Sequence, residues 1–126
     1  MAQQPWAQRF GSAAGAATLG PASRHARADR PAIIHVGEQE PDREMSWDEL
    51  LGRTAALAQT LRSHGVEPGD RVVGYLPNIP EAVIAMLAVT SLGGVWSSCS
   101  PDFGASAVLD RLGQVEPKVL FACDAY

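Results

Sequence analysis

The sequence predicts an α/β fold, specifically a partial doubly wound parallel sheet. Three short apolar segments, at residues 72–76, 95–99 and 119–123, have the composition of buried strands. Segments of helical length fill the two gaps between them. Strands that alternate with helices pair in parallel, and right-handed crossovers then lay the sheet out in a doubly wound arrangement.

The chain before these strands predicts a hairpin and a helix. Residues 32–36 form a short apolar strand that pairs with residues 44–46 across a polar loop. Ser46 and Glu49 have the spacing of a capping box, in which each side chain bonds the other's backbone N–H. The helix covers about residues 47–63, and its buried stripe recurs at three and four residues: Trp47, Leu50, Thr54, Leu57 and Leu61. Met45 and Leu50 are placed as a hydrophobic staple, and His64 and Gly65 suit the C-terminal cap.

Later elements follow from turn and cap signals. Residues 67–70 form a Pro-Gly turn into the first parallel strand. Asn78 is the expected N-cap of a helix over residues 79–92, which Gly93 ends. A third helix covers about residues 105–115, and we expect its core face to be Val108, Leu109, Leu112 and Val115.

Composition excludes several classes of protein. The chain has 126 residues, 46% of them hydrophobic and 19% charged, which argues against disorder. A net charge of -4 argues against nucleic acid as a partner. The longest apolar run, at residues 82–89, is too short for a membrane helix, and two cysteines do not make a disulfide framework. These features favour a soluble protein of a reducing compartment, the cytoplasm, with no membrane contact.

The first 30 residues differ from the rest. They are rich in Ala, Gly and Ser and carry four arginines against one aspartate. Three interpretations stay open: a disordered leader, a mistranslated or truncated start, and an Arg-rich transit peptide. We take residues 1–30 as the expected leader and residues 31–126 as the folded part.

The common catalytic motifs are missing from this sequence. It has no P-loop, no dinucleotide fingerprint, no G-x-S-x-G, no H-E-x-x-H and no C-x-x-C. His35 lies in an apolar strand and suits a structural role better than a catalytic one. Lys118, the single lysine, follows Pro117 and is expected to be solvated. We therefore predict no catalytic residue and no metal site.

One stretch, residues 96–102, stands at the carboxyl end of a predicted parallel strand, where open α/β sheets bind ligands. Two interpretations compete. Its small hydroxylated residues could contact a ligand, or they could simply pack under a helix that Asp102 caps. Cys99 suits a small buried hydrophobe better than a nucleophile.

Several motifs, in order, resemble those of adenylate-forming enzymes, the acyl-CoA synthetase superfamily. Residues 45–50 (MSWDEL) resemble its first core motif, and residues 69–72 (GDRV) and 78–81 (NIPE) resemble the next landmarks. Residues 92–98 (LGGVWSS) occupy the place of its second core motif. The runs 74–82 and 96–104, continuing to 114–118, look especially like the acetoacetyl-CoA synthetases. The resemblance covers about residues 29–126.

The resemblance implies an N-terminal fragment of an acid–CoA ligase with the adenylate-forming fold. Such enzymes use ATP, Mg²⁺ and coenzyme A to convert a carboxylic acid, here acetoacetate or a similar acid, into a thioester. The phosphate loop, the metal site and the mobile C-terminal domain of the family lie downstream of these motifs. We therefore expect the chain alone to be inactive and to bind none of these ligands tightly. By resemblance, Trp96, Ser97 and Ser98 are the candidate contacts for coenzyme A.

Two alternatives accompany this hypothesis. The chain could belong to another short-chain acyl-CoA synthetase, such as an acetate or propionate enzyme. It could instead be a non-catalytic α/β module that binds or pairs with another protein.

The segment 16–21 (AATLGP) departs from the pattern of the acetoacetate enzymes. Those enzymes usually carry an aromatic-Asn and Glu-Asn-Leu-Leu segment just before the first strand.

Overall fold

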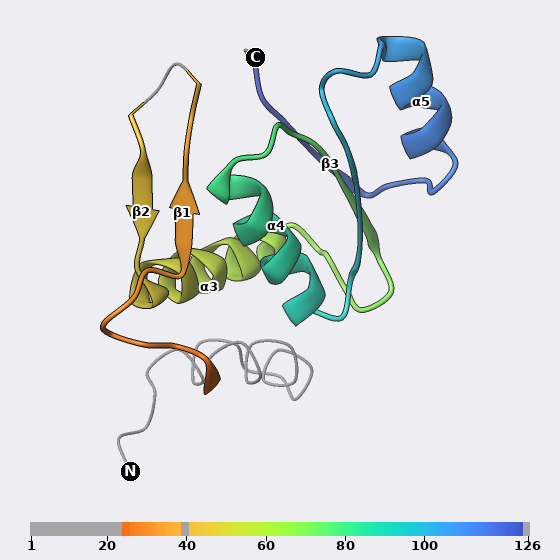
Figure 1. Cartoon of the computed structure of the whole chain (residues 1–126). Helices are drawn as coiled ribbons and strands as arrows, with labels where there is room; N and C mark the ends of the chain where they lie inside the picture. The colour runs from red at the N-terminus through yellow and green to blue at the C-terminus, as the bar shows by residue number, and fades with distance from the viewer. Residues whose placement is uncertain (1–23, 39–40, 125–126) are drawn as a thin grey trace.

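A computed structural model describes residues 24–38 and 41–124. It contains a β-hairpin followed by alternating helices and parallel strands (Figure 1). The elements are β1 (Ile33–His35), β2 (Arg43–Met45), α3 (Trp47–Ser63), β3 (Arg71–Tyr75), α4 (Pro80–Ser91), β4 (Val95–Cys99), α5 (Ala105–Gly113) and β5 (Val119–Ala122). The predicted α/β fold class is confirmed, and each predicted strand and helix is present within a few residues of its expected bounds.

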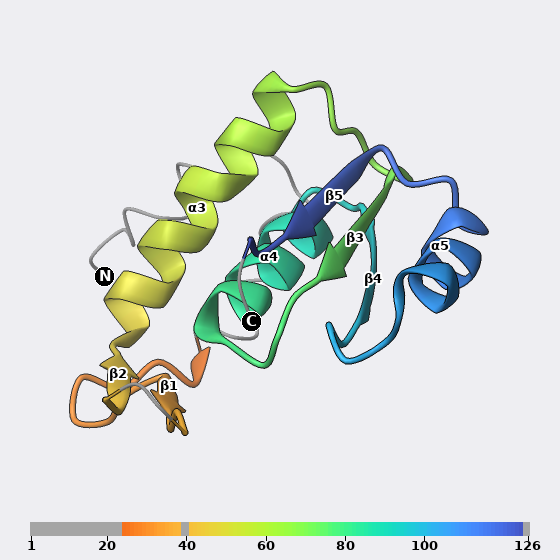
Figure 2. The same cartoon turned by 90° about the horizontal axis from the view of Figure 1, so that it is seen from above.

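The three later strands form one parallel sheet in the order β4-β3-β5. The chain steps from β3 to one side, then crosses back over β3 to reach β5. Because both crossovers are expected to be right-handed, these opposite steps put their helices on opposite faces. Figure 2 shows this arrangement, with α4 between α3 and the sheet and α5 beyond the sheet.

The start of α3 follows the sequence signals closely. The Ser46 hydroxyl accepts a hydrogen bond from the Glu49 backbone N–H at 3.1 Å, which is one half of the expected capping box. The Glu49 carboxylate turns instead toward Arg53, 3.8 Å away. The helix ends with His64 as its C-cap and with Gly65 at φ +82°, the left-handed conformation that glycine adopts without a steric penalty.

The core lies between α3, α4 and one face of the sheet. Its buried members include Leu51 and Leu61 of α3, Val72 of β3 and Val89 of α4. A second, smaller cluster of Met45, Leu50 and Ile84 joins the hairpin to both helices, so the staple pair does pack together. The buried stripe of α3 differs from the predicted one, because Trp47 and Leu57 are only partly buried. Leu51, Ala55 and Ala58, which were not predicted, are buried.

Three local predictions are wrong. Ile79, not Asn78, is the N-cap of α4, because Pro80 occupies the first helical position, where its fixed φ and missing N–H are favourable. Gly104, not Asp102, is the N-cap of α5. Leu109 is 73% exposed, and Leu112 is the single buried residue of α5. This short helix contacts the sheet mainly along β4, so only a narrow face of it is covered.

The expected leader falls mostly on residues 1–23, which lie outside the described residues. Residues 24–30 precede β1 and hold a local ion pair between Arg27 and Asp29, with Nε 3.0 Å from Oδ1. The division into a leader and a folded part from residue 31 remains a prediction. None of the described helices is both long and apolar enough to cross a membrane.

Candidate functional site

The carboxyl ends of β3, β4 and β5 meet at one edge of the sheet. Tyr75, the last residue of the central strand, is paired in register with Cys99 on one side and Ala122 on the other. Loops leave this edge toward α4 and α5. Ligands of open α/β sheets bind outside this edge, so the hollows there are the candidate binding sites.

One hollow, of about 300 Å³, lies between the end of β4 and the loop from β3 to α4; we call it the strand-end hollow. Its lining is uncharged and contains an amide, two hydroxyls and a thiol. It consists of Leu76, Pro77, Asn78, Ala82, Ser98, Cys99 and Ser100. Such a surface can hydrogen-bond a neutral polar group, but it offers no charge to a phosphate.

The structure does not bring the three residues expected to contact a ligand to one surface. Side chains alternate along a strand, so Trp96 and Ser98 share one face of β4 and Ser97 points to the other. Of the three, Ser98 alone lines the strand-end hollow and is exposed. The indole of Trp96 packs against the main core, with its centroid 6.2 Å from that of Phe121. Trp96 therefore has a structural role in this chain.

The loop from β4 to α5, residues 100–104, continues the edge of this hollow. The Tyr75 hydroxyl lies 3.1 Å from the carbonyl oxygens of both Pro101 and Phe103 and can donate to either. Within the loop, the Ser100 hydroxyl donates to the Asp102 carboxylate at 2.7 Å, and the Asp102 backbone N–H donates to the Ser100 hydroxyl oxygen at 3.2 Å. Sequence reasoning missed Tyr75, because a tyrosine in an apolar strand carries no sign of the loop it will reach.

A second hollow, of about 400 Å³, lies between α3, α4 and the end of β5, and we call it the helix-side cleft. Its lining is apolar apart from two charged side chains. The lining residues are Arg53, Leu57, Leu76, Ile79, Glu81, Ile84, Ala85, Phe121, Ala122 and Cys123. The two cysteines, Cys99 and Cys123, are free thiols.

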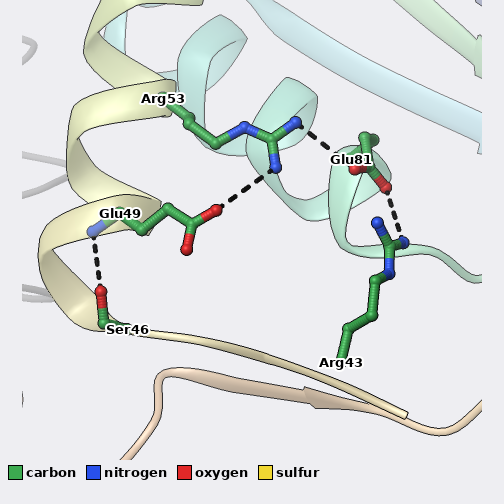
Figure 3. A network of polar contacts seen from close by, with 5 residues as sticks. All are labelled: Arg43, Ser46, Glu49, Arg53 and Glu81. Carbon is green, nitrogen blue, oxygen red and sulfur yellow. Dashed lines mark hydrogen bonds and ion pairs between the residues drawn. The ribbon is translucent and has the colours of Figure 1, made fainter. Parts of the chain in front are cut away.

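The charges beside the helix-side cleft balance one another (Figure 3). The Glu81 carboxylate lies 3.4 Å from the guanidinium groups of both Arg43 and Arg53. Burial acts to raise the pKa of Glu81, but hydrogen bonds from its own backbone N–H and from both arginines outweigh this and hold the pKa below its usual value. The network joins β2, α3 and α4, so its evident role is structural.

The single lysine is also engaged in the fold. The Lys118 ammonium lies 2.8 Å from Oδ2 of Asp70 and donates to the Gly65 carbonyl oxygen, so it is not simply solvated as expected. These contacts tie the start of β5 to the turn between α3 and β3. The Lys118 hydrogen bond, followed by one from the Glu67 backbone N–H, holds the pKa of Asp70 below its ordinary value of 3.8.

These contacts decide whether the described residues fit ATP and Mg²⁺. No group of three or more His, Cys, Asp or Glu residues among them could hold a metal ion. Near the sheet, Arg43, Arg53 and Lys118 face carboxylates, and the Arg71 guanidinium donates to the carbonyl oxygens of Val115 and Glu116. A nucleotide triphosphate needs fixed cations and backbone donors aimed at it, and the described part of the chain does not supply that arrangement.

Comparison with known proteins gives consistent matches. A family model described as "AMP-binding enzyme" matches residues 22–126. The acetoacetyl-coenzyme A synthetase of Rhizobium meliloti is 48% identical over 95 residues, which are 75% of this chain and 15% of that protein. The acetyl-coenzyme A synthetase 2 of Zygosaccharomyces bailii is 43% identical over 104 residues, which are 80% of this chain and 15% of that protein.

A solved structure agrees with these relatives. The acetoacetyl-CoA synthetase from Streptomyces lividans superposes on this chain with a TM-score of 0.73 and 50% sequence identity. The match covers 93% of this chain and 17% of the solved one. The chain thus spans about 15% of the length of the curated relatives it matches.

Proposed function

Because this chain belongs to the AMP-binding enzyme family, we propose that it forms the N-terminal part of an acetoacetate–CoA ligase. The observation that carries the proposal is its 48–50% identity to proteins named acetoacetyl-CoA synthetase. Such a ligase joins a carboxylate to ATP, releases pyrophosphate, and then lets the thiol of coenzyme A displace AMP. We propose the cytoplasm as its compartment, which suits the free thiols of Cys99 and Cys123.

Within that enzyme, the chain supplies framework and one binding surface. The described residues do not fit ATP or Mg²⁺, so no step of acid activation is assigned to them. The parallel sheet fixes the strand ends, and the core packing of Trp96 holds β4 in place. We therefore assign acid activation to parts of the enzyme outside this chain.

We propose that coenzyme A binds in the strand-end hollow. Of the three candidate contact residues Trp96, Ser97 and Ser98, Ser98 lines this hollow, together with Ser100. The arm of coenzyme A is rich in neutral amides, which match a lining of hydroxyl and amide groups better than charged phosphates do. Trp96 and Ser97 then act by holding the strand rather than by touching the ligand.

Acetoacetate is proposed over acetate or propionate because the Rhizobium meliloti relative and the Streptomyces lividans structure are both named acetoacetyl-CoA synthetase. Percentage identity alone does not separate the acids: the acetyl-coenzyme A synthetase 2 is 43% identical and the acetoacetyl-CoA synthetase of Xenopus tropicalis is 40% identical, so a direct comparison is needed. The test grafts this chain in place of the equivalent segment of two hosts, the Streptomyces lividans acetoacetyl-CoA synthetase and the Zygosaccharomyces bailii acetyl-coenzyme A synthetase 2. Each graft is assayed for thioester formation with its host's own acid and compared with its unmodified host.

We expect the acetoacetate host to retain the larger fraction of its activity. A larger retained fraction in the acetate host would favour the other short-chain ligase. Loss of all activity in two folded grafts would favour a non-catalytic α/β binding module.

A further inference from the structure

We propose that Tyr75 is a positioning residue whose hydroxyl fixes the loop of residues 100–104 and thereby sets the affinity for coenzyme A. The inference rests on the proposed function, since it concerns the same strand-end hollow. Tyr75 ends β3, the central strand, which is paired on both sides. Its position is therefore fixed by the sheet, while the loop it reaches leaves the outer strand β4.

The hydroxyl makes two contacts with one loop. Its oxygen lies 3.1 Å from the Pro101 carbonyl oxygen and 3.1 Å from that of Phe103. Both acceptors are backbone atoms, so the contacts fix the path of the main chain rather than one side chain. A donor shared by carbonyls two residues apart holds the intervening residue, Asp102, in a defined turn.

Contacts within the loop close its turn, and another contact joins the loop to α5. The Ser100 hydroxyl bonds Asp102, and the Phe103 N–H donates to the Ser100 carbonyl, so the turn is closed upon itself. Arg111 of α5 lies over the Phe103 ring, 4.5 Å from its centroid, which ties the loop to its own helix. Tyr75 instead links this unit to the central strand.

The loop begins at the proposed binding surface. Ser100 lines the strand-end hollow beside Ser98, and it is also the first residue of the turn that Tyr75 holds. Movement of the loop would displace the Ser100 side of the hollow and leave the β3–α4 side in place. The Tyr75 hydroxyl should therefore affect coenzyme A binding without touching coenzyme A.

The test uses Tyr75→Phe in the graft with the acetoacetate host. Phenylalanine keeps the ring in place and removes only the hydroxyl. We expect the KM for coenzyme A to rise roughly two- to tenfold, the loss expected for one ordinary hydrogen bond, while the KM for ATP stays unchanged. Acetoacetate-dependent ATP–pyrophosphate exchange, which needs no coenzyme A, should also be unchanged.

Thr60→Val is the matched control. It removes a hydroxyl that bonds only its own helix, at the Ala56 carbonyl oxygen, away from the strand ends. It should leave both KM values as they were. A Tyr75→Phe variant whose KM for coenzyme A is unchanged, or whose two KM values rise together, would overturn the proposal.

Backbone amide hydrogen exchange separates this inference from the proposed function. In the 126-residue chain and in the graft, Tyr75→Phe should speed exchange at Phe103, whose N–H closes the turn, and should spare α3. Unchanged exchange at Phe103 would overturn the positioning role whatever the activity of the graft. An inactive graft with faster exchange at Phe103 would instead retain the positioning role and remove the proposed function.

Discussion

The indole of Trp96 lies so close over Gly74 that a Cβ atom built on Gly74 would come within 2.6 Å of Cη2 of Trp96. The two residues stand on neighbouring strands, and Trp96 also meets Phe121 across the sheet. Glycine at position 74 is therefore required by close approach and not by an unusual backbone angle. This contact fixes how β4, and with it Ser98, sits against the central strand.

Gly74→Ala should destabilise the fold by about 1–3 kcal/mol, because a rigid indole that is packed in the core must move to admit one methyl group. Gly52→Ala is the control. Gly52 lies in the interior of α3 with nothing within 4 Å of its added Cβ, so its replacement should be neutral or stabilise by up to about 1 kcal/mol. The measurement is the free energy of unfolding of each variant from urea denaturation. An equal change in Gly74→Ala and Gly52→Ala would contradict the close approach of Trp96 to Gly74.

Thr54→Val should raise the stability of the fold. Thr54 is fully buried in α3, and its hydroxyl oxygen has no hydrogen-bond partner among the described residues. Valine has the same shape without the polar atom, so the free energy of unfolding should increase by roughly 1–2 kcal/mol. The matched variant Thr60→Val, at a hydroxyl that does have a partner, should give no increase. A loss of stability in Thr54→Val would show that its hydroxyl is satisfied.

Acid should weaken the fold partly through Asp70 and Glu81, whose pKa values both lie below their ordinary values of 3.8 and 4.5. A carboxyl with a depressed pKa stabilises the folded state above its unfolded pKa, and that stabilisation is lost as pH falls through the folded pKa. The free energy of unfolding should therefore fall as pH drops below about 4 to 5.

Asp70→Asn should reduce this acid dependence and lower stability near pH 7, because it breaks the contact with Lys118. Asp110→Asn, an exposed carboxylate of α5, is the control and should leave the acid dependence unchanged. The measurement is chemical denaturation at a series of pH values from 3 to 7. If the acid dependence of Asp70→Asn equals that of the wild type, Asp70 does not contribute to the loss of stability in acid.

Ser98→Phe in the acetoacetate graft should raise the KM for coenzyme A more than that for ATP, because the bulky ring fills the strand-end hollow. Val95→Phe is the comparison variant, placed at the opposite end of the same strand, where Val95 is 52% exposed. It should leave both constants unaltered. Equal increases for the two ligands in Ser98→Phe would count against the coenzyme A assignment.

Sequence reasoning succeeded where a local signal determines the structure. The capping serine Ser46, the left-handed Gly65 and the period of the three strands all act over a few residues, and each is in place. The family resemblance was likewise confirmed, because its motifs lie in one continuous stretch. Each of these features depends on residues that are close together in the sequence, so the sequence alone was enough to predict it.

Predictions failed where the exact start of a helix or a distant partner decided the structure. Ile79, and not Asn78, is the N-cap of α4 because Pro80 occupies the first helical position. Asp102 is not the N-cap of α5 because that helix begins at Ala105, directly after Gly104. In the candidate site, alternation along β4 could have separated Ser97 from Ser98 in advance. The reach of Tyr75 to the loop could not be foreseen, because it depends on the sheet order.

We propose that this chain supplies framework and a coenzyme A surface to an acetoacetate–CoA ligase, and that the activation chemistry belongs to other parts of that enzyme. Acetoacetate-dependent ATP–pyrophosphate exchange tests this most directly, run on the 126-residue chain and on its graft in the Streptomyces lividans acetoacetyl-CoA synthetase. We predict no exchange from the chain alone and exchange from the graft. Exchange catalysed by the chain itself, or none from a graft shown to be folded, would contradict the account.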